Sequence, residues 1–260
     1  MRVWFSASNL VLVVAQAACV ALPGTGVPVW LERFRGRGWA LTLPLSIAVV
    51  VAAIQLLPTT ADALSWVAFL LIPPGCALAL AWAARGAHPA AAPLAAVALA
   101  VAWASPQTRA GELATIVLIA GSVITLGRLL AGIAPLPLLK AGVIAMAAVD
   151  AWLVFSGRLE QPNAVLIAAA PGLGLPQLQS AGFAGAGLGY GDFFAAAVVG
   201  GILAAERGPR LSAAAGMVVV SLCWDQLFLV YDVLPATMPP AVVLLAAEVR
   251  AARRRGRRGT

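Results

Sequence analysis

Long apolar stretches alternate with short polar connections along almost the entire chain. Nine of these stretches have lengths close to the ~20 residues that a helix needs to cross a bilayer. They cover Ser8–Leu22, Trp39–Leu57, Asp62–Ala84, Pro89–Ala104, Gly111–Ile133, Leu138–Phe155, Gly187–Ala205, Leu211–Tyr231, and a last stretch from Met238 to the arginine-rich segment 250–258. The pattern predicts an all-α, polytopic membrane protein with nine transmembrane helices.

Two parts are expected within this bundle. Residues 1–137 would form five helices, and residues 138–260 four helices followed by a basic tail. Ser8–Leu22 has features of a signal peptide, but we interpret it as a retained helix, because the orientation given below requires it. Pro73 and Pro74 fall inside the third stretch and should kink or break its helix, since each removes a backbone donor.

Composition supports a membrane protein and excludes several kinds of chemistry. Of the 260 residues, 62% are hydrophobic and 10% are charged, against about 25% charged in soluble domains. The three cysteines all lie in apolar stretches, so they indicate neither a disulfide framework nor a metal site. The lone histidine, His88, lies in a connection, which excludes a zinc protease with two motif histidines. The composition therefore gives no indication of a metal site.

The distribution of positive charge predicts the orientation. The basic residues gather on the connections after the first, third, fifth and seventh stretches and at the C-terminus. They are Arg33, Arg35, Arg37, Arg85, Arg128, Lys140, Arg207, Arg210 and the arginines of 250–258. With nine helices these sites share one side, so the positive-inside rule places the N-terminus outside and the C-terminus in the cytoplasm. The terminal arginines then favour contact with the lipid bilayer rather than with nucleic acid.

Two acids stand inside consecutive apolar stretches. An ionisable side chain at membrane depth costs at least ~2.5–3.5 kcal/mol, which indicates a function. Asp150 lies twelve residues beyond Leu138, about 18 Å from the inner end of its helix. In a core of ~30 Å this leaves ~12 Å to the outer surface, and Asp192 lies about 8 Å below that surface. The two carboxyls are therefore predicted to meet at similar depth on antiparallel helices.

Two carboxyls that meet in apolar surroundings share one proton, since both cannot easily ionise. The charged group can act as a general base on water while the protonated group donates to a carbonyl oxygen. The glycines Gly187, Gly189 and Gly191 suit this chemistry, because they let backbone and substrate approach closely. Asp225, at a comparable depth in the eighth stretch, is interpreted as a carboxylate that packs between helices or faces water.

Several motifs carry a resemblance to a known family. Gly189-Tyr-Gly-Asp192 resembles the GxGD motif of the presenilin and signal-peptide-peptidase family. Val149–Phe155 is similar to the YD segment of that family, with Val149 in place of the tyrosine. Pro240-Ala241-Val242 resembles the PAL motif, with valine in place of leucine, and Pro235-Ala236-Thr237 is a second candidate. These matches occur in the family's order over the last four predicted helices.

The resemblance implies a presenilin-like fold of nine helices and peptide hydrolysis within the membrane, with neither a metal nor a cofactor. Its catalytic residues would be Asp150 and Asp192. Substrate contacts would come from Gly189, Tyr190, Gly191, Pro240, Ala241 and Val242. The N-outside orientation looks like that of the signal-peptide-peptidase branch, so the expected substrates are single-span membrane proteins or signal peptides. The expected location is a prokaryotic cell membrane.

Two other functions remain open. Prepilin peptidases also use a GxGD aspartate, although Phe193-Phe194 follows here where they carry a lysine-bearing segment. A proton-coupled transporter is the non-enzyme alternative, because intramembrane acids also mark ion pathways.

The connection between the two acids contains seven apolar residues, Ala164–Ala170, which are too few to span a membrane. We expect them to be extended and able to pair with an unwound substrate by strand addition.

Overall fold

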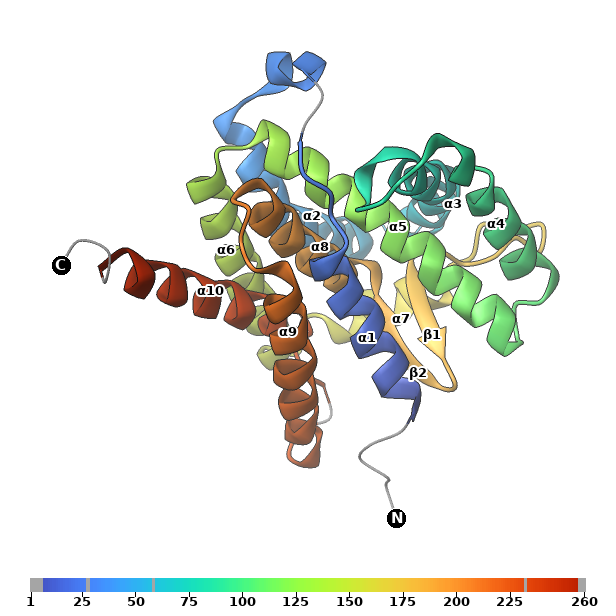
Figure 1. The fold of residues 1–260 in the computed structure, drawn as a ribbon. Helices are drawn as coiled ribbons and strands as arrows, with labels where there is room; N and C mark the ends of the chain where they lie inside the picture. The colour runs from blue at the N-terminus through green and yellow to red at the C-terminus, as the bar shows by residue number, and fades with distance from the viewer. Residues whose placement is uncertain (1–6, 27–28, 58, 232, 257–260) are drawn as a thin grey trace.

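The computed structural model describes residues 7–26, 29–57, 59–231 and 233–256. The described chain is mostly helical, with ten α-helices arranged as a bundle (Figure 1). Nine of them lie in the nine predicted stretches, and the tenth, α7, lies in the connection between the two acids. The nine are α1 Ala7–Ala21, α2 Thr42–Leu56, α3 Thr60–Leu78, α4 Leu94–Ala104, α5 Arg109–Ile133, α6 Leu136–Phe155, α8 Tyr190–Ala205, α9 Arg210–Asp225 and α10 Met238–Gly256.

Five helical segments are long and apolar enough to cross a membrane, which is compatible with a membrane protein. They are Arg37–Leu56, Thr60–Ala83, Arg109–Ile133, Leu136–Phe155 and Arg210–Leu229. α1, α4 and α8 are apolar but shorter. α10 differs from all of these, because charged residues begin at Glu248 and only its first ten residues are apolar. Nine crossings therefore stay a prediction.

The centre of the bundle is the pairing of α5 with α8, the most extensive helix contact among the described residues. Glycines allow these backbones to come close together. A Cβ on Gly127 of α5 would lie 2.3 Å from the carbonyl oxygen of Ala197, and one on Gly201 of α8 would lie 2.4 Å from that of Gly127. Small residues at such positions are typical of helix pairs packed in a membrane. α3 and α4 cover other parts of α5, and α1 packs on both α8 and α9.

The proline pair in α3 does not break the helix. α3 continues through Pro73 and Pro74 and changes to a π-helix, η3, only at Ala79–Ala83. The neighbouring helix contributes polar contacts here, since the Thr125 hydroxyl donates to the Gly75 carbonyl at 2.8 Å. The Gly75 carbonyl also accepts from the backbone N–H of Ala79, so the Thr125 bond ties α3 to α5 just after the prolines.

The connection between the acids is structured, and the expectation of an extended Ala164–Ala170 segment is wrong. Residues Glu160–Ala168 form the helix α7. Its residues are mostly good helix formers, and Pro162 is in the first turn, where the missing N–H has no helical acceptor. The backbone becomes extended only at Ala169, and Gly172 and Gly174 follow with positive φ.

A β-hairpin precedes α8 and modifies the all-α prediction. Strands β1 Ser180–Phe183 and β2 Ala186–Gly189 pair antiparallel with Ser180 opposite Gly189. The two residues between them, Ala184 and Gly185, both have positive φ, which matches the twist of a two-residue hairpin turn. Because β2 uses residues 186–189, α8 begins at Tyr190 and not at Gly187 as predicted.

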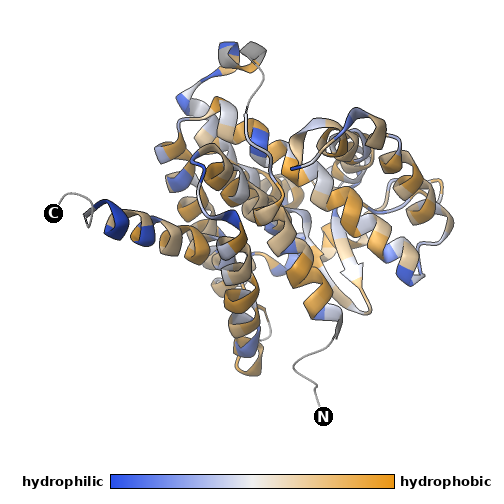
Figure 2. Cartoon of the chain, in the orientation of Figure 1, coloured by the Kyte–Doolittle hydropathy of each residue, from blue (hydrophilic) through white to orange (hydrophobic). Residues whose placement is uncertain are grey.

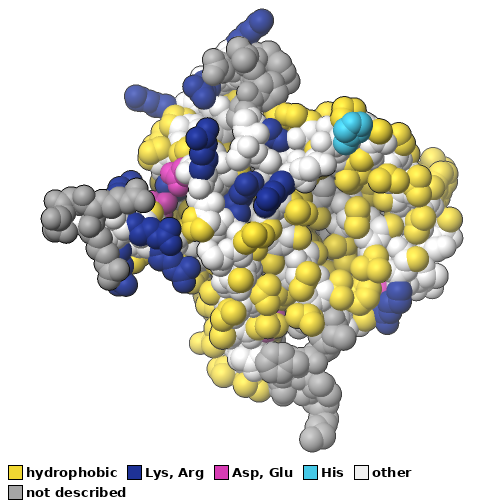
Figure 3. All heavy atoms as spheres, viewed as in Figure 1, with side chains coloured by type: hydrophobic (Ala, Val, Ile, Leu, Met, Phe, Trp, Pro, Cys, Tyr) yellow, Lys and Arg dark blue, Asp and Glu magenta, His cyan; other side chains and the backbone are white. Residues whose placement is uncertain are grey.

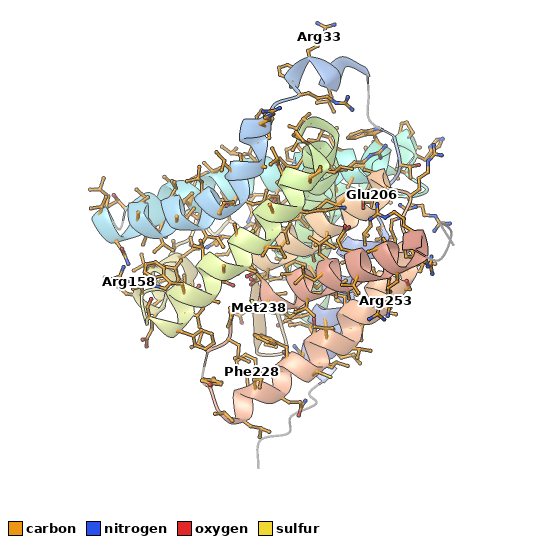
Figure 4. All side chains as sticks on the ribbon, turned by 90° about the vertical axis from the view of Figure 1, so that its left-hand side faces the viewer. Arg33, Arg158, Glu206, Phe228, Met238 and Arg253 are labelled. Carbon is orange, nitrogen blue, oxygen red and sulfur yellow. The ribbon has the colours of Figure 1, made fainter. Side chains whose placement is uncertain are left out.

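Hydrophobic residues make up most of the helices (Figure 2), and hydrophobic side chains cover much of the face seen in Figure 3. Large exposed examples come from α2, α3, α4 and α9: Val49, Leu56, Leu70, Leu71, Val97, Trp103, Leu211 and Val219. In Figure 3 most arginine and lysine side chains gather toward the upper and left edges, away from the apolar area. Figure 4 places Arg33 and Phe228 at opposite ends of the molecule. This arrangement of an apolar surface with a basic side is compatible with a protein embedded in a bilayer.

Candidate active site

Asp150 lies on the buried face of α6, and its side chain is 6% exposed. Both hydrogen bonds to the Asp150 carboxyl come from Thr237, which lies just before α10. The Thr237 hydroxyl donates to Asp150 Oδ2 at 2.6 Å, and the Thr237 backbone N–H donates to the same oxygen at 3.3 Å. Two donors on one oxygen fix the carboxyl plane and leave Oδ1 without a hydrogen-bond partner among the described residues.

Asp192 is held by the local change from strand to helix. It is the third residue of α8, and its Oδ2 accepts a hydrogen bond of 3.0 Å from the backbone N–H of Gly189. A carboxylate is favoured there, because the first N–H groups of a helix have no internal acceptor and the helix dipole attracts negative charge. Gln16 of α1 fixes the backbone, since its Nε2 donates to the Asp192 carbonyl at 3.2 Å. Asp192, like Asp150, is oriented through one carboxyl oxygen only.

The two acids lie on neighbouring helices. α6 and α8 pack against each other, and the Asp150 and Asp192 carboxyls are close enough to interact electrostatically. None of the ion pairs within the described residues includes either acid. Two like-charged groups with no basic partner favour a state in which one proton is shared. Such a pair can activate a water molecule and donate to a carbonyl oxygen in the same step.

The residues of the GxGD motif lie beside Asp192 and have distinct contacts. Tyr190 OH forms a hydrogen bond of 2.9 Å with the hydroxyl of Ser122 on α5. Gly191 is exposed, and a Cβ added there would meet no atom within 4 Å. A Cβ on Gly189 would lie 3.2 Å from Asp192 Oδ2. Gly189 thus leaves room for the carboxylate, and the surface at Gly191 is open to an approaching chain.

The two candidates for the PAL motif occupy different positions. Pro240 and Ala241 are buried in the first turns of α10, while Val242 is 38% exposed. Thr237, the last residue of the alternative Pro235-Ala236-Thr237, is the residue that contacts Asp150. Sequence reasoning did not select Thr237, and the only signal for it was this weaker motif match. Substrate contacts by Pro240, Ala241 and Val242 stay a prediction.

Asp225 is placed differently from the other two acids. It is the last residue of α9 and is partly buried. Its carboxyl makes no hydrogen bond or ion pair that joins it to Asp150, to Asp192 or to a basic residue in the described chain. It therefore lacks the oriented geometry that the other two carboxyls share, and no role in the site follows for it.

Charged residues at the other end of the same helices form a cluster that the sequence did not indicate. Lys140 of α6 binds Glu206, just after α8, at 2.5 Å, and Glu248 of α10 at 2.6 Å. In Figure 4, α10 runs from Met238 toward Arg253, and Glu206 lies toward the Arg253 end. Lys140 precedes Asp150 by ten residues and Glu248 follows Thr237 by eleven. The contacts Asp150–Thr237 and Lys140–Glu248 therefore show that α6 and α10 run antiparallel. At 1.5 Å per residue the two contacts are about 15 Å apart.

Arg128, one of the basic residues that predict the orientation, is buried and holds two segments of the chain together. It is 6% exposed, its guanidinium lies 4.1 Å from the centre of the Trp82 ring, and it donates at 2.5 Å to the Trp82 carbonyl. It also donates to the carbonyls of Thr25, at 2.8 Å, and Gly26. A buried charge needs such compensation, so Arg128 fixes the segment after α1 against η3.

Among the described residues, no group of three histidines, cysteines or acids is placed to hold a metal ion. Comparison of the chain with protein-family models, with curated proteins and with solved structures found no match.

Proposed function

We propose that this protein is an aspartyl protease that hydrolyses peptide bonds within the membrane. The observation that supports this most is the pair of carboxyls on the packed helices α6 and α8. Asp150 and Asp192 interact electrostatically, have no basic partner in the described chain, and are each oriented through one oxygen. A pair that needed only to stabilise the fold would be expected to include a counter-ion.

In the proposed reaction, the ionised carboxyl takes a proton from water as the water oxygen attacks the peptide carbonyl carbon. The protonated carboxyl donates its proton to the carbonyl oxygen, which forms a tetrahedral gem-diol. The proton on the first carboxyl then passes to the leaving nitrogen, the C–N bond breaks, and the second carboxyl recovers its proton from a diol hydroxyl. The free Oδ1 atoms of Asp150 and Asp192 are available for these transfers.

The proposed topology has nine passes, with the N-terminus outside and the C-terminus in the cytoplasm of a prokaryotic cell. The α6–α10 pairing supports a short last pass. Thr237 lies at the depth of Asp150, and the apolar half of α10 covers the remaining ~15 Å to the Lys140 cluster. α10 thus starts inside the bilayer and need not be a full-length span. The basic residues after its apolar half then lie at the cytoplasmic surface.

The proposed substrates are single-span membrane proteins or signal peptides. A membrane-spanning helix satisfies its own backbone groups, so it must unwind locally before water and carboxyls can reach a peptide bond. The open surface at Gly191 and the hairpin that ends at Gly189 suit the approach of an extended segment to Asp192. The same geometry would accommodate a prepilin-like substrate, but nothing in the site favours that choice.

The test is incubation of the purified protein with a single-span reporter in detergent and in liposomes. Wild type should produce two fragments whose masses define cleavage inside the apolar segment, and Asp150→Ala and Asp192→Ala should produce none. Cleavage that persists in both folded variants would overturn the proposal. If wild type cleaves nothing but conducts protons in liposomes in an Asp-dependent way, the transporter is the better interpretation.

A further inference from the structure

Gln179 immediately precedes β1 and is buried, with 7% of its surface exposed. Its Nε2 donates to the Ala169 carbonyl at 2.6 Å and to the Leu166 carbonyl at 3.2 Å. These carbonyls are at the end of α7, where a helix has no further N–H groups to supply. Gln179 therefore connects the end of α7 to the start of the hairpin.

The side-chain oxygen of the same amide is buried and has no hydrogen-bond partner among the described residues. Exchanging the oxygen and nitrogen would not remove the problem, because the oxygen would then face two carbonyl oxygens, which cannot donate. The two Nε2 bonds thus fix the amide and leave Oε1 as a buried acceptor. Buried polar atoms are nearly always paired in folded proteins, so this oxygen calls for a donor from a water molecule or from a ligand.

The backbone of Gln179 is joined to the proposed catalytic site. The Gln179 carbonyl accepts a hydrogen bond of 3.1 Å from the backbone N–H of Tyr190, which extends the β1–β2 ladder by one pair. The adjacent pair joins Ser180 to Gly189, whose N–H donates to Asp192. Gln179 is therefore one residue pair along the hairpin from Gly189, the residue that orients Asp192.

We infer that Gln179 is a substrate-positioning residue whose Oε1 accepts a hydrogen bond from a backbone N–H of the unwound substrate segment. The inference rests on the proposed function. Unwinding a helix in an apolar environment exposes N–H groups that must find acceptors, and the fixed amide oxygen of Gln179 provides one once substrate binding uncovers it. The contact would set which peptide bond faces Asp150 and Asp192.

The experiment measures binding of a fluorescent single-span peptide to full-length protein carrying Asp192→Asn, so that no turnover occurs. Gln179→Met removes the acceptor and keeps the side-chain length. Gln177→Met is the matched control, because Gln177 Nε2 also donates to the Ala169 carbonyl, at 3.0 Å, but its side chain is exposed. We expect Gln179→Met to weaken binding by roughly 5–10-fold and Gln177→Met to change it less than twofold.

A scan of the peptide identifies the donor. Replacing one backbone amide at a time by an ester removes a single N–H. At one position near the cleavage site the ester should weaken binding to Gln179-containing protein by a similar factor, and it should have no effect on Gln179→Met. Equal losses in both proteins at every position would overturn the inference and would mean that Gln179 Oε1 accepts a hydrogen bond from water, not from the substrate.

Cleavage by otherwise wild-type protein provides the second measurement. Gln179→Met should raise KM and spread the cleavage positions, while Gln177→Met keeps one main position. Should Gln179→Met fail to fold, Gln179→Asn keeps a polar amide near the end of α7 but withdraws the whole amide group by one methylene, and it should give the same loss. If wild type cleaves and the Gln179 variants match Gln177→Met, only this inference fails. If wild type never cleaves, the proposed protease function fails instead.

Discussion

Two clusters of ionisable side chains lie along the same helices, about 15 Å apart on α6 and α10, and they differ in kind. At the end near Lys140, a cation contacts the carboxylates of Glu206 and Glu248, and opposite charges are paired. At the other end, Asp150 and Asp192 have the same charge sign and interact with each other, and only neutral donors orient them. The same scaffold thus holds one paired and one unpaired set of charges.

The difference separates charges that maintain the fold from charges that are available for chemistry. A carboxylate paired with lysine has its charge compensated and gains little from a proton. A carboxyl beside another acid gains or loses a proton at the expense of its neighbour, so the pair can pass protons to and from a substrate. The following changes should therefore affect activity at one end and stability at the other.

The largest expected effect comes from the acid pair. Asp150→Asn and Asp192→Asn should each lower kcat for reporter cleavage by about 10²–10⁴-fold or more, because an amide can neither share the proton nor activate water. The double variant should be no worse than either single one, since the two groups act as a unit. Fragment formation over time measures this, with unfolding temperatures to confirm that each variant is folded. Additive losses would show that the two acids work independently.

Thr237→Val should have the next largest effect. It removes the hydroxyl that donates to Asp150 Oδ2 at 2.6 Å but keeps the shape of the side chain. Loss of a hydrogen bond to a charged group corresponds to about a tenfold or greater loss of activity. We expect kcat to fall by about that factor with little change in KM, and Thr237→Ser to recover most of it. If Val242→Ala lowered kcat more than Thr237→Val, Pro240–Val242 would be the segment that supports the acids.

Changes to the Lys140 cluster should alter stability more than chemistry. Lys140→Met leaves Glu206 and Glu248 without their cation, and all three side chains are partly exposed. Ion pairs of this kind contribute about 1 kcal/mol or less each. We expect a lower unfolding temperature in detergent, a smaller difference at high salt because salt screens the pairs, and kcat close to wild type. A large loss of kcat without a loss of stability would indicate that the two clusters are coupled.

The smallest effect is expected at Asp225. Asp225→Asn keeps the shape of a side chain that is not joined to the acid pair or to a cation in the described chain. Activity should stay within about twofold, and any change should appear as a small shift in unfolding temperature, because the substitution breaks none of the interactions that orient the acid pair. An inactive Asp225→Asn beside an active Asp192→Asn would reverse the assignment and favour the transporter.

The sequence alone determined the features that depend on local pattern. Apolar stretches of sufficient length place nine of the ten helices, since backbone groups in an apolar environment must pair within a helix. The sequence also placed Asp150 and Asp192 on two helices, α6 and α8, that pack against each other in the structure. These conclusions need only helix geometry and the thickness of a bilayer.

Only the tertiary structure decided the contacts between distant segments. Thr237 reaches Asp150 across 87 positions, and Glu248 reaches Lys140 across 108. The pattern of apolar positions along the chain does not indicate which polar side chains contact each other, because a single hydroxyl or amide group hardly alters that pattern. The hairpin and α7 were missed for a related reason. Their short segments have weak local preferences, and contacts with the rest of the bundle, such as the capping of α7 by Gln179, select among them.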